Sequence, residues 1–234
     1  MVSLLDDYLE RQLARGKAYF TREEALRALR LAPDSLTAAL SRLIRKRRIA
    51  NPRHGFYLIL RPEDRPAGAP DPARWIDPLM KYQRIDYRVS LLNAAAWHGA
   101  SHQAAMAFQV VVPRQLRDFQ LGRHRLEFIT QAPPAFAKGN RPEWLAQMKT
   151  DAGTARAAGI ELTLLDCARY FHRAGGISAV ARIAKDLGAR ARARGPFAGE
   201  AKSVKLLDPS SRTAPGETSG RWKIAVNGPV EFDA

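Results

Sequence analysis

The sequence has little cysteine and no long apolar run, and each shortage excludes a class of protein. Cys167 is the single cysteine among 234 residues, so the chain has neither an intramolecular disulfide nor a thiolate zinc cage. No apolar run approaches the ~20 residues that span a bilayer. The start, Met1 to Leu5, leads straight into Asp6 and Asp7, unlike the basic and then apolar start of a signal peptide. We therefore expect a cytoplasmic protein with no membrane partner.

Acidic residues are also in the minority. The chain has 38 Lys and Arg against 23 Asp and Glu, which gives a formal net charge of +15. Its 46% apolar and 26% charged residues are typical of a soluble globular protein. An excess of this size favours an anionic partner, and nucleic acid is the first candidate because each neutralised phosphate releases counterions. By charge alone a membrane surface ranks second, behind nucleic acid, although we expect no membrane partner. A well-solvated Arg-rich surface with no partner is the plain alternative.

Proline marks the expected domain boundary. Residues 61–72 (RPEDRPAGAPDP) contain four prolines and no large apolar side chain, which predicts a semi-rigid linker. The predicted domains are therefore a compact module over residues 1–60, a linker over 61–72, and a mixed α/β domain over 73–234. Most of residues 188–220 is expected to be loop, followed by a strand over 222–226 and a turn at Asn227–Gly228.

The first 60 residues show three helical patterns followed by a β-rich segment. The apolar spacing of residues 4–13 predicts a helix that ends at Gly16. Thr21 followed by Glu24 forms a capping-box pattern at the start of a second, short helix. Pro33 is expected in the first turn of a third helix, whose buried side is predicted from Leu36, Leu40, Leu43 and Ile44. A turn over residues 51–55 and a strand over 56–60 then complete a hairpin.

This order predicts a winged helix-turn-helix, in which the third helix enters the major groove of DNA. The residues expected to reach base edges are Ser35, Thr37, Ala38, Ser41 and Arg42. Those expected to contact phosphates are Arg45, Lys46, Arg47 and Arg48. At the hairpin tip, Arg53 and His54 are expected to touch the DNA backbone or a minor groove. Residues 1–60 contain twelve basic and six acidic residues, a net charge of +6. A winged helix can instead serve as a protein-interaction adaptor, and Asp34 at the helix start would repel phosphate.

The rest of the chain alternates helices and strands. A helix rich in small residues is expected over 91–98, strands over 108–112 and 126–130, and helices over 159–170 and 177–187. With the N-terminal module, these elements predict an α+β protein.

Catalytic or metal-binding groups are scarce in this second part. Three pairs have a spacing that could suggest chemistry: His98 with His102, Cys167 with His172, and Glu161 with Asp166. Gly99 and Ser101 interrupt any helix between the histidines, and the other two pairs point to different sides of a helix. The sequence therefore predicts no enzymatic activity, no metal and no cofactor. Tyr87, Ser90, His98 and His102 could be functional or simply hydrogen-bonded polar groups beside a buried helix.

Several segments together resemble a known family. They are DYRVSLLNAAAWHGASHQ (86–103), FQVVVPRQLR (108–117), LEFIT (126–130) and GIELTLLDCARY with FHRAGGISAVARIAKDL (159–187). With the N-terminal module, they resemble the AbiEi antitoxins of type IV toxin–antitoxin and phage abortive-infection systems. The resemblance covers residues ~5–187.

The resemblance implies a repressor that binds its own promoter, at inverted repeats in double-stranded DNA. It also implies that the C-terminal domain counteracts a nucleotidyltransferase-type toxin functionally, without a stable complex. Basic positions of the second domain are then candidates for a second charged surface: Arg114, Arg117, Arg123 and Arg125. The alternative is a nucleic-acid-processing enzyme or a ligand-responsive regulator with a pocket in the C-terminal domain, near His98, His102 or Asp166.

Overall fold

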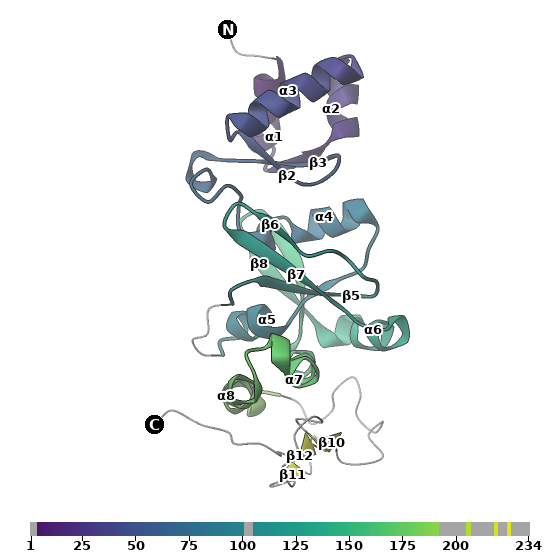
Figure 1. Ribbon diagram of the computed structural model, residues 1–234, viewed down its shortest axis with the longest axis vertical. Coiled ribbons are helices and arrows are strands. Elements are labelled where there is room, and N and C mark those ends of the chain that lie inside the picture. The colour runs from purple at the N-terminus through teal and green to yellow at the C-terminus, as the bar shows by residue number, and fades with distance from the viewer. Residues whose placement is uncertain (1–3, 101–104, 192–204, 207–217, 220–223, 226–234) are drawn as a thin grey trace. The chain divides into compact units, whose positions relative to one another are not determined.

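The structure is a computed structural model that describes residues 4–100, 105–191, 205–206, 218–219 and 224–225. Helices and sheets are mixed along the chain, as expected for the α+β class (Figure 1). The chain divides into two compact units, and each is built from segments that are distant in sequence. Unit 1 comprises Met1–Asp86, Arg117–Glu127 and Met148–Ala155, and unit 2 comprises Tyr87–Leu116, Phe128–Gln147 and Arg156–Ala234.

Unit 1 begins with three helices and a small sheet. The helices are α1 (Leu4–Ala14), α2 (Arg22–Leu29) and α3 (Pro33–Arg45). The strands β1 (Tyr19–Thr21), β2 (Ile49–Arg53) and β3 (Phe56–Ile59) pair antiparallel in the order β1-β3-β2. The three predicted helices are thus present, whereas the short strand β1 was missed.

Local sequence signals explain where these helices start and stop. Gly16 has φ +73°, the left-handed conformation that ends a helix without steric cost. Thr21 accepts a hydrogen bond from the Glu24 backbone N–H at 3.2 Å, and the Glu24 carboxylate accepts one from the Thr21 N–H at 2.8 Å. This is the predicted capping box. Pro33 occupies the first turn of α3, where its missing N–H costs nothing.

The core of these elements forms from the apolar sides of the three helices. Leu5, Tyr8 and Leu9 of α1 pack with Leu36 and Leu40 of α3 and with the sheet. Ile44, however, is 42% exposed, so its predicted place in the core is wrong. The buried stripe of α3 consists of Leu36, Leu40 and Leu43. Ile44 directly follows Leu43 in the helix and therefore points away from that face.

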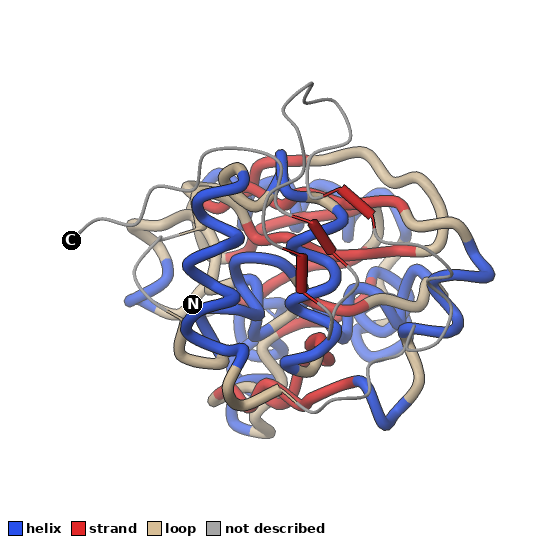
Figure 2. The backbone as a smooth tube through the Cα atoms, turned by 90° about the horizontal axis from the view of Figure 1, so that it is seen from below, coloured by secondary structure: helices blue, strands red, loops and turns tan. Residues whose placement is uncertain are grey.

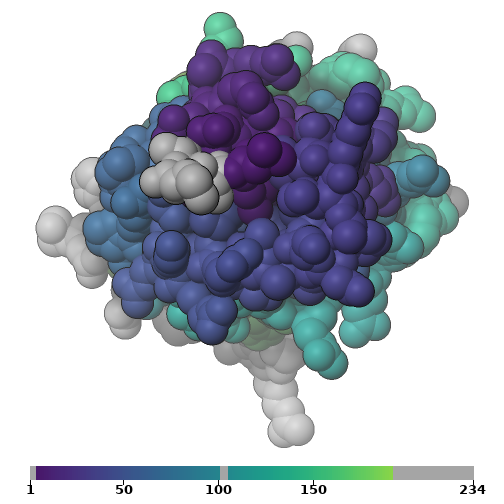
Figure 3. Space-filling view, turned by 90° about the horizontal axis from the view of Figure 1, so that it is seen from above, coloured from purple at the N-terminus to yellow at the C-terminus, as the bar shows by residue number. Residues whose placement is uncertain are grey.

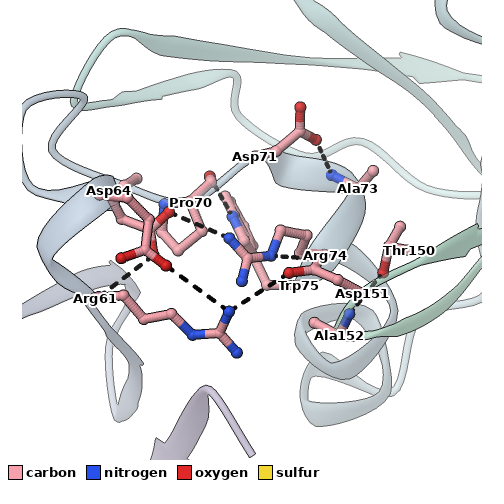
Figure 4. Close-up of polar contacts among 12 residues, drawn as sticks. Arg61, Asp64, Pro70, Asp71, Ala73, Arg74, Trp75, Thr150, Asp151 and Ala152 are labelled. Carbon is pink, nitrogen blue, oxygen red and sulfur yellow. Dashed lines mark hydrogen bonds and ion pairs between the residues drawn. The ribbon is translucent and has the colours of Figure 1, made fainter. Parts of the chain in front are cut away.

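The proline-rich segment lies inside unit 1, whereas the sequence predicted a linker between domains there. It forms two short 3-10 helices, Pro62–Asp64 and Pro72–Arg74, and leads into α4 (Ile76–Gln83). Arg74 pairs with Asp64 at 3.2 Å and with Asp151 at 2.8 Å, and Asp151 also lies 3.5 Å from Arg61 (Figure 4). These ion pairs tie the segment to the turn at residues 151–152, so it is part of a packed unit.

A six-stranded sheet has the order β6-β7-β5-β4-β9-β8. In chain order its strands are β4 (Arg88–Val89), β5 (Phe108–Val112), β6 (Phe119–Leu121), β7 (His124–Thr130), β8 (Leu145–Thr150) and β9 (Gly153–Ala158). Strand β4 pairs antiparallel with β5 and parallel with β9. The predicted strands at 108–112 and 126–130 are confirmed as β5 and the greater part of β7.

The helices of unit 2 pack on one another and on the strands. They are α5 (Leu91–Trp97), α6 (Pro133–Gly139), α7 (Ile160–Arg169) and α8 (Ile177–Gly188), with 3-10 turns at Pro142–Trp144 and Phe171–Arg173. Their core joins Leu91, Val111, Leu164 and Ile183. Figure 2 shows helices and strands from below, coloured by type. The predicted helices at 91–98, 159–170 and 177–187 are confirmed to within a residue.

Three short strands follow: β10 (Lys205–Leu206), β11 (Thr218–Ser219) and β12 (Ile224–Ala225), in the order β10-β12-β11. Strand β12 lies within the predicted strand over 222–226. The other residues of that prediction, the turn at Asn227–Gly228 and most of the predicted loop over 188–220 lie outside the described residues.

A candidate nucleic-acid interface

Helix α3 presents a polar and basic face to solvent. Ser35, Ala38, Ser41, Arg42 and Arg45 are all exposed and recur at helical spacing. Leu36, Leu40 and Leu43 hold the opposite face in the core. The small side chains along the first half of this face would let a groove of DNA approach closely, and Arg42 can make a bidentate hydrogen bond to guanine. Figure 3 views unit 1 from the end where α1, α2 and α3 lie, with residues 4–60 in purple to blue.

An exposed side-chain contact joins the start of α3 to α2. The Arg22 guanidinium donates to the Pro33 carbonyl oxygen at 3.0 Å, which joins α2 to the first turn of α3. The Thr37 hydroxyl donates to the same oxygen at 2.8 Å. Thr37 is exposed as predicted, but its hydroxyl proton is used within the helix, so only its oxygen lone pairs and methyl face a partner.

The basic run from Arg45 to Arg48, at the end of α3, is only partly exposed to solvent. Arg45, Lys46 and Arg47 are exposed, and Arg47 adopts φ +51° where the helix ends. The Arg48 N–H donates back to the Leu43 carbonyl at 2.9 Å, as in a left-handed helix stop. The Arg48 side chain is half-buried and lies 3.4 Å from the Asp6 carboxylate. Three of the four predicted phosphate contacts are thus on the surface, and the fourth is paired with an acid of α1.

The hairpin differs from its prediction. Strand β2 runs through Asn51 and Pro52 to Arg53, which leaves only His54 and Gly55 between the strands. The β2–β3 register shifts between Ala50 and Arg53, so Pro52 lies at an irregularity where no ladder hydrogen bond is lost. The predicted five-residue turn is therefore wrong, because a β-bulge accommodates the proline within the strand.

Arg53 is engaged inside unit 1. Its guanidinium donates to the Arg117 carbonyl oxygen at 2.7 Å and lies 3.9 Å from the centre of the Phe119 ring. Burial lowers the pKa of Arg53 from its ordinary value. His54 is exposed, and its carbonyl oxygen accepts a hydrogen bond from the Tyr82 hydroxyl at 3.1 Å.

The expected second basic surface is divided between the units. Its members are all exposed: Arg114, Arg117, Arg123 and Arg125. Arg117, Arg123 and Arg125 belong to unit 1, and Arg114 belongs to unit 2. Arg125 also lies 3.1 Å from the Glu127 carboxylate, which reduces its positive field.

A buried ion pair in unit 2 was missed by the sequence analysis. Arg88 and Asp166 are 0% and 1% exposed, and their side chains make two parallel hydrogen bonds of 2.9 and 3.0 Å. Arg88 also donates to the Gln131 side chain at 2.7 Å, and Ser90 donates to Asp166 at 2.7 Å. The available signal was a charged residue within each of two apolar segments, since such residues are buried almost only in pairs.

The other polar residues noted in the sequence have partners within unit 2. The Tyr87 hydroxyl accepts from the Arg156 backbone N–H at 3.1 Å. His98 Nε2 lies 2.8 Å from the Ala158 carbonyl oxygen, which can only accept, so Nε2 carries the proton. Burial lowers the pKa of His98 and Arg190 lowers it further, against the opposite effects of this hydrogen bond and of Glu161. His102 lies outside the described residues.

The described residues offer little for catalysis. Cys167 is buried, and burial and the neighbouring Asp166 raise the pKa of its thiol. No group of three or more His, Cys, Asp or Glu among the described residues could hold a metal ion. A pocket between α5 and α8 is mostly apolar and is lined by Leu92, Ala95, Ala96, Ala100, Ala179, Arg182 and Ile183. Within the part of the chain that is described, no helix has the length and apolar character needed to cross a membrane.

Comparison with known families decides the identity of the second part. Residues 88–197 match the model of the AbiEi antitoxin C-terminal domain. The chain carries an AbiEi antitoxin C-terminal domain. The match begins at the buried Arg88 and includes its partner Asp166, so this ion pair is internal to the AbiEi domain. The predicted resemblance to the AbiEi family is confirmed, and the domain supports an antitoxin role in a toxin–antitoxin system. The AbiEi family also suggests a regulator rather than an enzyme.

The chain is also similar to a protein of known structure. It is similar to the crystal structure of RV2827C protein from Mycobacterium tuberculosis, with a TM-score of 0.54 and 15% sequence identity. The similarity covers 94% of this chain and 89% of that chain. At this identity the similarity establishes the fold alone. No curated protein matches the sequence.

Proposed function

We propose that the chain is an antitoxin that represses its own operon by binding promoter DNA through α3. Residues 1–60 form the DNA-binding module in this proposal, a winged helix-turn-helix with α2 and α3 as its helix pair. The observation that carries the proposal is the exposed face of α3, with small residues at its start and arginine at its end. A recognition helix needs this arrangement, because bases are read where the backbone approaches closely and phosphates are held by cations beside it.

The arrangement around α3 supports this role. The element order α1, β1, α2, α3, β2, β3, with the sheet order β1-β3-β2, places a tight turn before α3 and a hairpin after it. Arg45, Lys46 and Arg47 follow the base-reading positions and are free to contact phosphates. Asp34 is exposed at the start of α3, where its carboxylate interacts favourably with the helix dipole. The same carboxylate disfavours close contact with phosphate, but only at the N-terminal end of α3.

The second half of the proposal concerns the toxin. The AbiEi domain is expected to counteract a nucleotidyltransferase-type toxin, functionally and without a stable complex. DNA binding and toxin neutralisation are then assigned to different residues, α3 for the first and the AbiEi domain for the second. This division makes the two activities separable by mutation.

A test in cells follows from that division. The double variant Arg42→Ala/Arg45→Ala is compared with Arg11→Ala, which removes an exposed arginine from α1 instead. We expect the double variant to lose repression of a reporter driven by the operon's own promoter, while Arg11→Ala represses like the wild type. Both should still rescue growth of cells that express the toxin. Full repression by the double variant would overturn the assignment of α3, and a wild type that fails to rescue growth would overturn the antitoxin role.

A further inference from the structure

The hairpin next to the proposed recognition helix is held at its far end by residues outside it. The Arg53 guanidinium lies 3.9 Å from the centre of the Phe119 ring of β6 and donates to the Arg117 carbonyl at 2.7 Å. All three residues belong to unit 1, although Arg53 and Arg117 are separated by 64 positions. A planar guanidinium stacked on an aromatic ring, with a second N–H directed to a carbonyl, is a rigid contact that a lysine ammonium does not reproduce.

A second contact holds the same end of the hairpin from α4. The Tyr82 hydroxyl donates to the His54 carbonyl at 3.1 Å, and its ring lies 5.4 Å from the Phe56 ring. Gly55, which turns the hairpin, has φ +78° and would bring a Cβ to 2.5 Å from the Tyr82 hydroxyl. Side chains from two elements thus contact this end of the hairpin: Tyr82 of α4 at the turn, and Phe119 of β6 at Arg53 just before it.

The hairpin in turn determines the position of α3. Only three residues separate the end of α3 from the start of β2, and the Arg48 backbone is bonded both to Leu43 of α3 and to Leu60, just after β3. Ile49 and Ile59 fix the near end of the hairpin in the core shared with α3, and Tyr57, closer to the turn, belongs to the same core. A movement of the hairpin against β6 is therefore transmitted to the C-terminal end of α3.

We propose that Arg53 is a positioning residue for DNA recognition and not a phosphate contact. Its guanidinium fixes the β2–β3 hairpin on Phe119 and the Arg117 carbonyl, and the hairpin holds the basic end of α3 in the orientation that DNA requires. This inference rests on the proposed function of α3. It differs from the sequence-based expectation, in which Arg53 touches the DNA backbone or a minor groove.

The first test needs no DNA. Amide hydrogen exchange of residues 49–59 is measured in the full-length protein for the wild type, Arg53→Ala and Phe119→Leu. We expect exchange near the hairpin end to be at least about tenfold faster in both variants, because each loses the stacked contact. Arg117→Ala is the matched control, since it removes a positive charge from the same segment and keeps the carbonyl that Arg53 uses. Wild-type exchange in both Arg53→Ala and Phe119→Leu would overturn the proposal.

The second test separates positioning from charge. Binding to the operon's promoter is measured for the same variants over a series of salt concentrations. Phe119→Leu changes no charge, yet we expect it to weaken specific binding about three- to tenfold, as Arg53→Ala does. In both variants the salt dependence of the affinity should be the same as in the wild type. A direct phosphate contact would instead make the slope of log affinity against log salt shallower by about 0.9 in Arg53→Ala alone. That result, with wild-type affinity in Phe119→Leu, would contradict the proposal.

The two tests also separate this inference from the proposed function. A wild type that binds promoter and scrambled DNA equally would overturn the function of α3, whatever the exchange data show. If the wild type prefers the promoter and the hairpin exchanges faster in both variants, unchanged binding by those variants would overturn the positioning role alone. Thermal unfolding of each variant shows that weaker binding is not the result of global unfolding.

Discussion

Arg88 and Asp166 are the pair of residues whose removal should affect the fold most. Both are buried, and the carboxylate accepts two hydrogen bonds from Arg88 and one from Ser90. Charges taken out of water are stable only while paired, so the loss of one partner leaves the other desolvated and uncompensated. The pair connects β4 to α7, and Gln131 adds the residue after β7, so three elements of the AbiEi domain meet at one guanidinium.

We therefore expect Asp166→Asn to lower the free energy of unfolding by about 3–5 kcal/mol in urea denaturation. The double variant Arg88→Met/Asp166→Leu should recover much of this loss, because it leaves no unpaired charge. Lys81→Ala is the control: its pair with Asp77 is also an ion pair, at 2.6 Å, but Lys81 is 73% exposed. The control should cost at most about 0.5 kcal/mol. Equal effects of Asp166→Asn and Lys81→Ala would contradict this account.

His98 gives unit 2 a predictable dependence on pH. Its pKa is lowered in the folded protein, first by burial, while in the unfolded chain it returns to about 6.5. The unfolded state therefore binds the proton first as the pH falls. The stability linked to His98 is present above about pH 6.5 and is lost as the pH drops from there to the folded pKa.

His98→Gln removes this titration and keeps a side-chain N–H that can donate to the Ala158 carbonyl. We expect the wild type to lose stability relative to His98→Gln between pH 8 and pH 5, as measured by urea unfolding at several pH values. If the difference in unfolding free energy between the two proteins stays constant over this pH range, His98 titrates alike in the folded and unfolded states, which would contradict the prediction.

At the scale of the element, local chemistry could be predicted from sequence and long-range pairing could not. The cap at Thr21, the proline at the start of α3 and the apolar stripe of α3 are encoded within a few residues, and they were predicted. The three-residue strand β1 has no periodicity of its own and exists because it pairs with β3. Two contacts join residues more than 60 positions apart in the sequence: Arg53 with the Arg117 carbonyl just before β6, and Arg61 with Asp151. No local sequence pattern predicts such contacts.

The turn between β6 and β7 contacts the proline-rich segment closely enough to exclude a side chain. Gly122 has φ +58°, and a Cβ there would overlap the Ala67 carbonyl oxygen and lie 2.8 Å from the Gly68 Cα. We expect Gly122→Ala to destabilise the protein by about 3 kcal/mol, from the strained backbone and the clash together. Gly16→Ala is the matched control, with φ +73° and nothing within 4 Å of its Cβ, and should cost only about 1 kcal/mol. Thermal unfolding of both variants checks the difference, and a Gly122→Ala protein as stable as Gly16→Ala would refute the close contact.

At the scale of the whole molecule, the interleaving of the two units limits what a sequence can show. The composition change at residues 61–72 predicts a domain boundary. However, residues 61–72 belong to unit 1 together with the later segments 117–127 and 148–155. Domain boundaries are predicted from local composition, whereas a compact unit is defined by contacts, and here the contacts come from three separate segments. Exposed arginines of α3 and of residues 117–127 belong to the same unit, although they are distant in the sequence.

The central claim is that α3 reads DNA, and direct binding of the purified protein tests it. Affinity for the operon's own promoter and for scrambled DNA of the same length is measured for the wild type, Arg42→Ala/Arg45→Ala and Arg11→Ala over a salt series. We predict a preference of the wild type for the promoter that the double variant loses, with Arg42 alone contributing about 1–3 kcal/mol if it contacts a base. Arg11→Ala should keep the preference. Weak binding of all three proteins to both DNAs, with the same steep salt dependence, would contradict the claim. It would show that the positive charge of the protein attracts DNA only non-specifically.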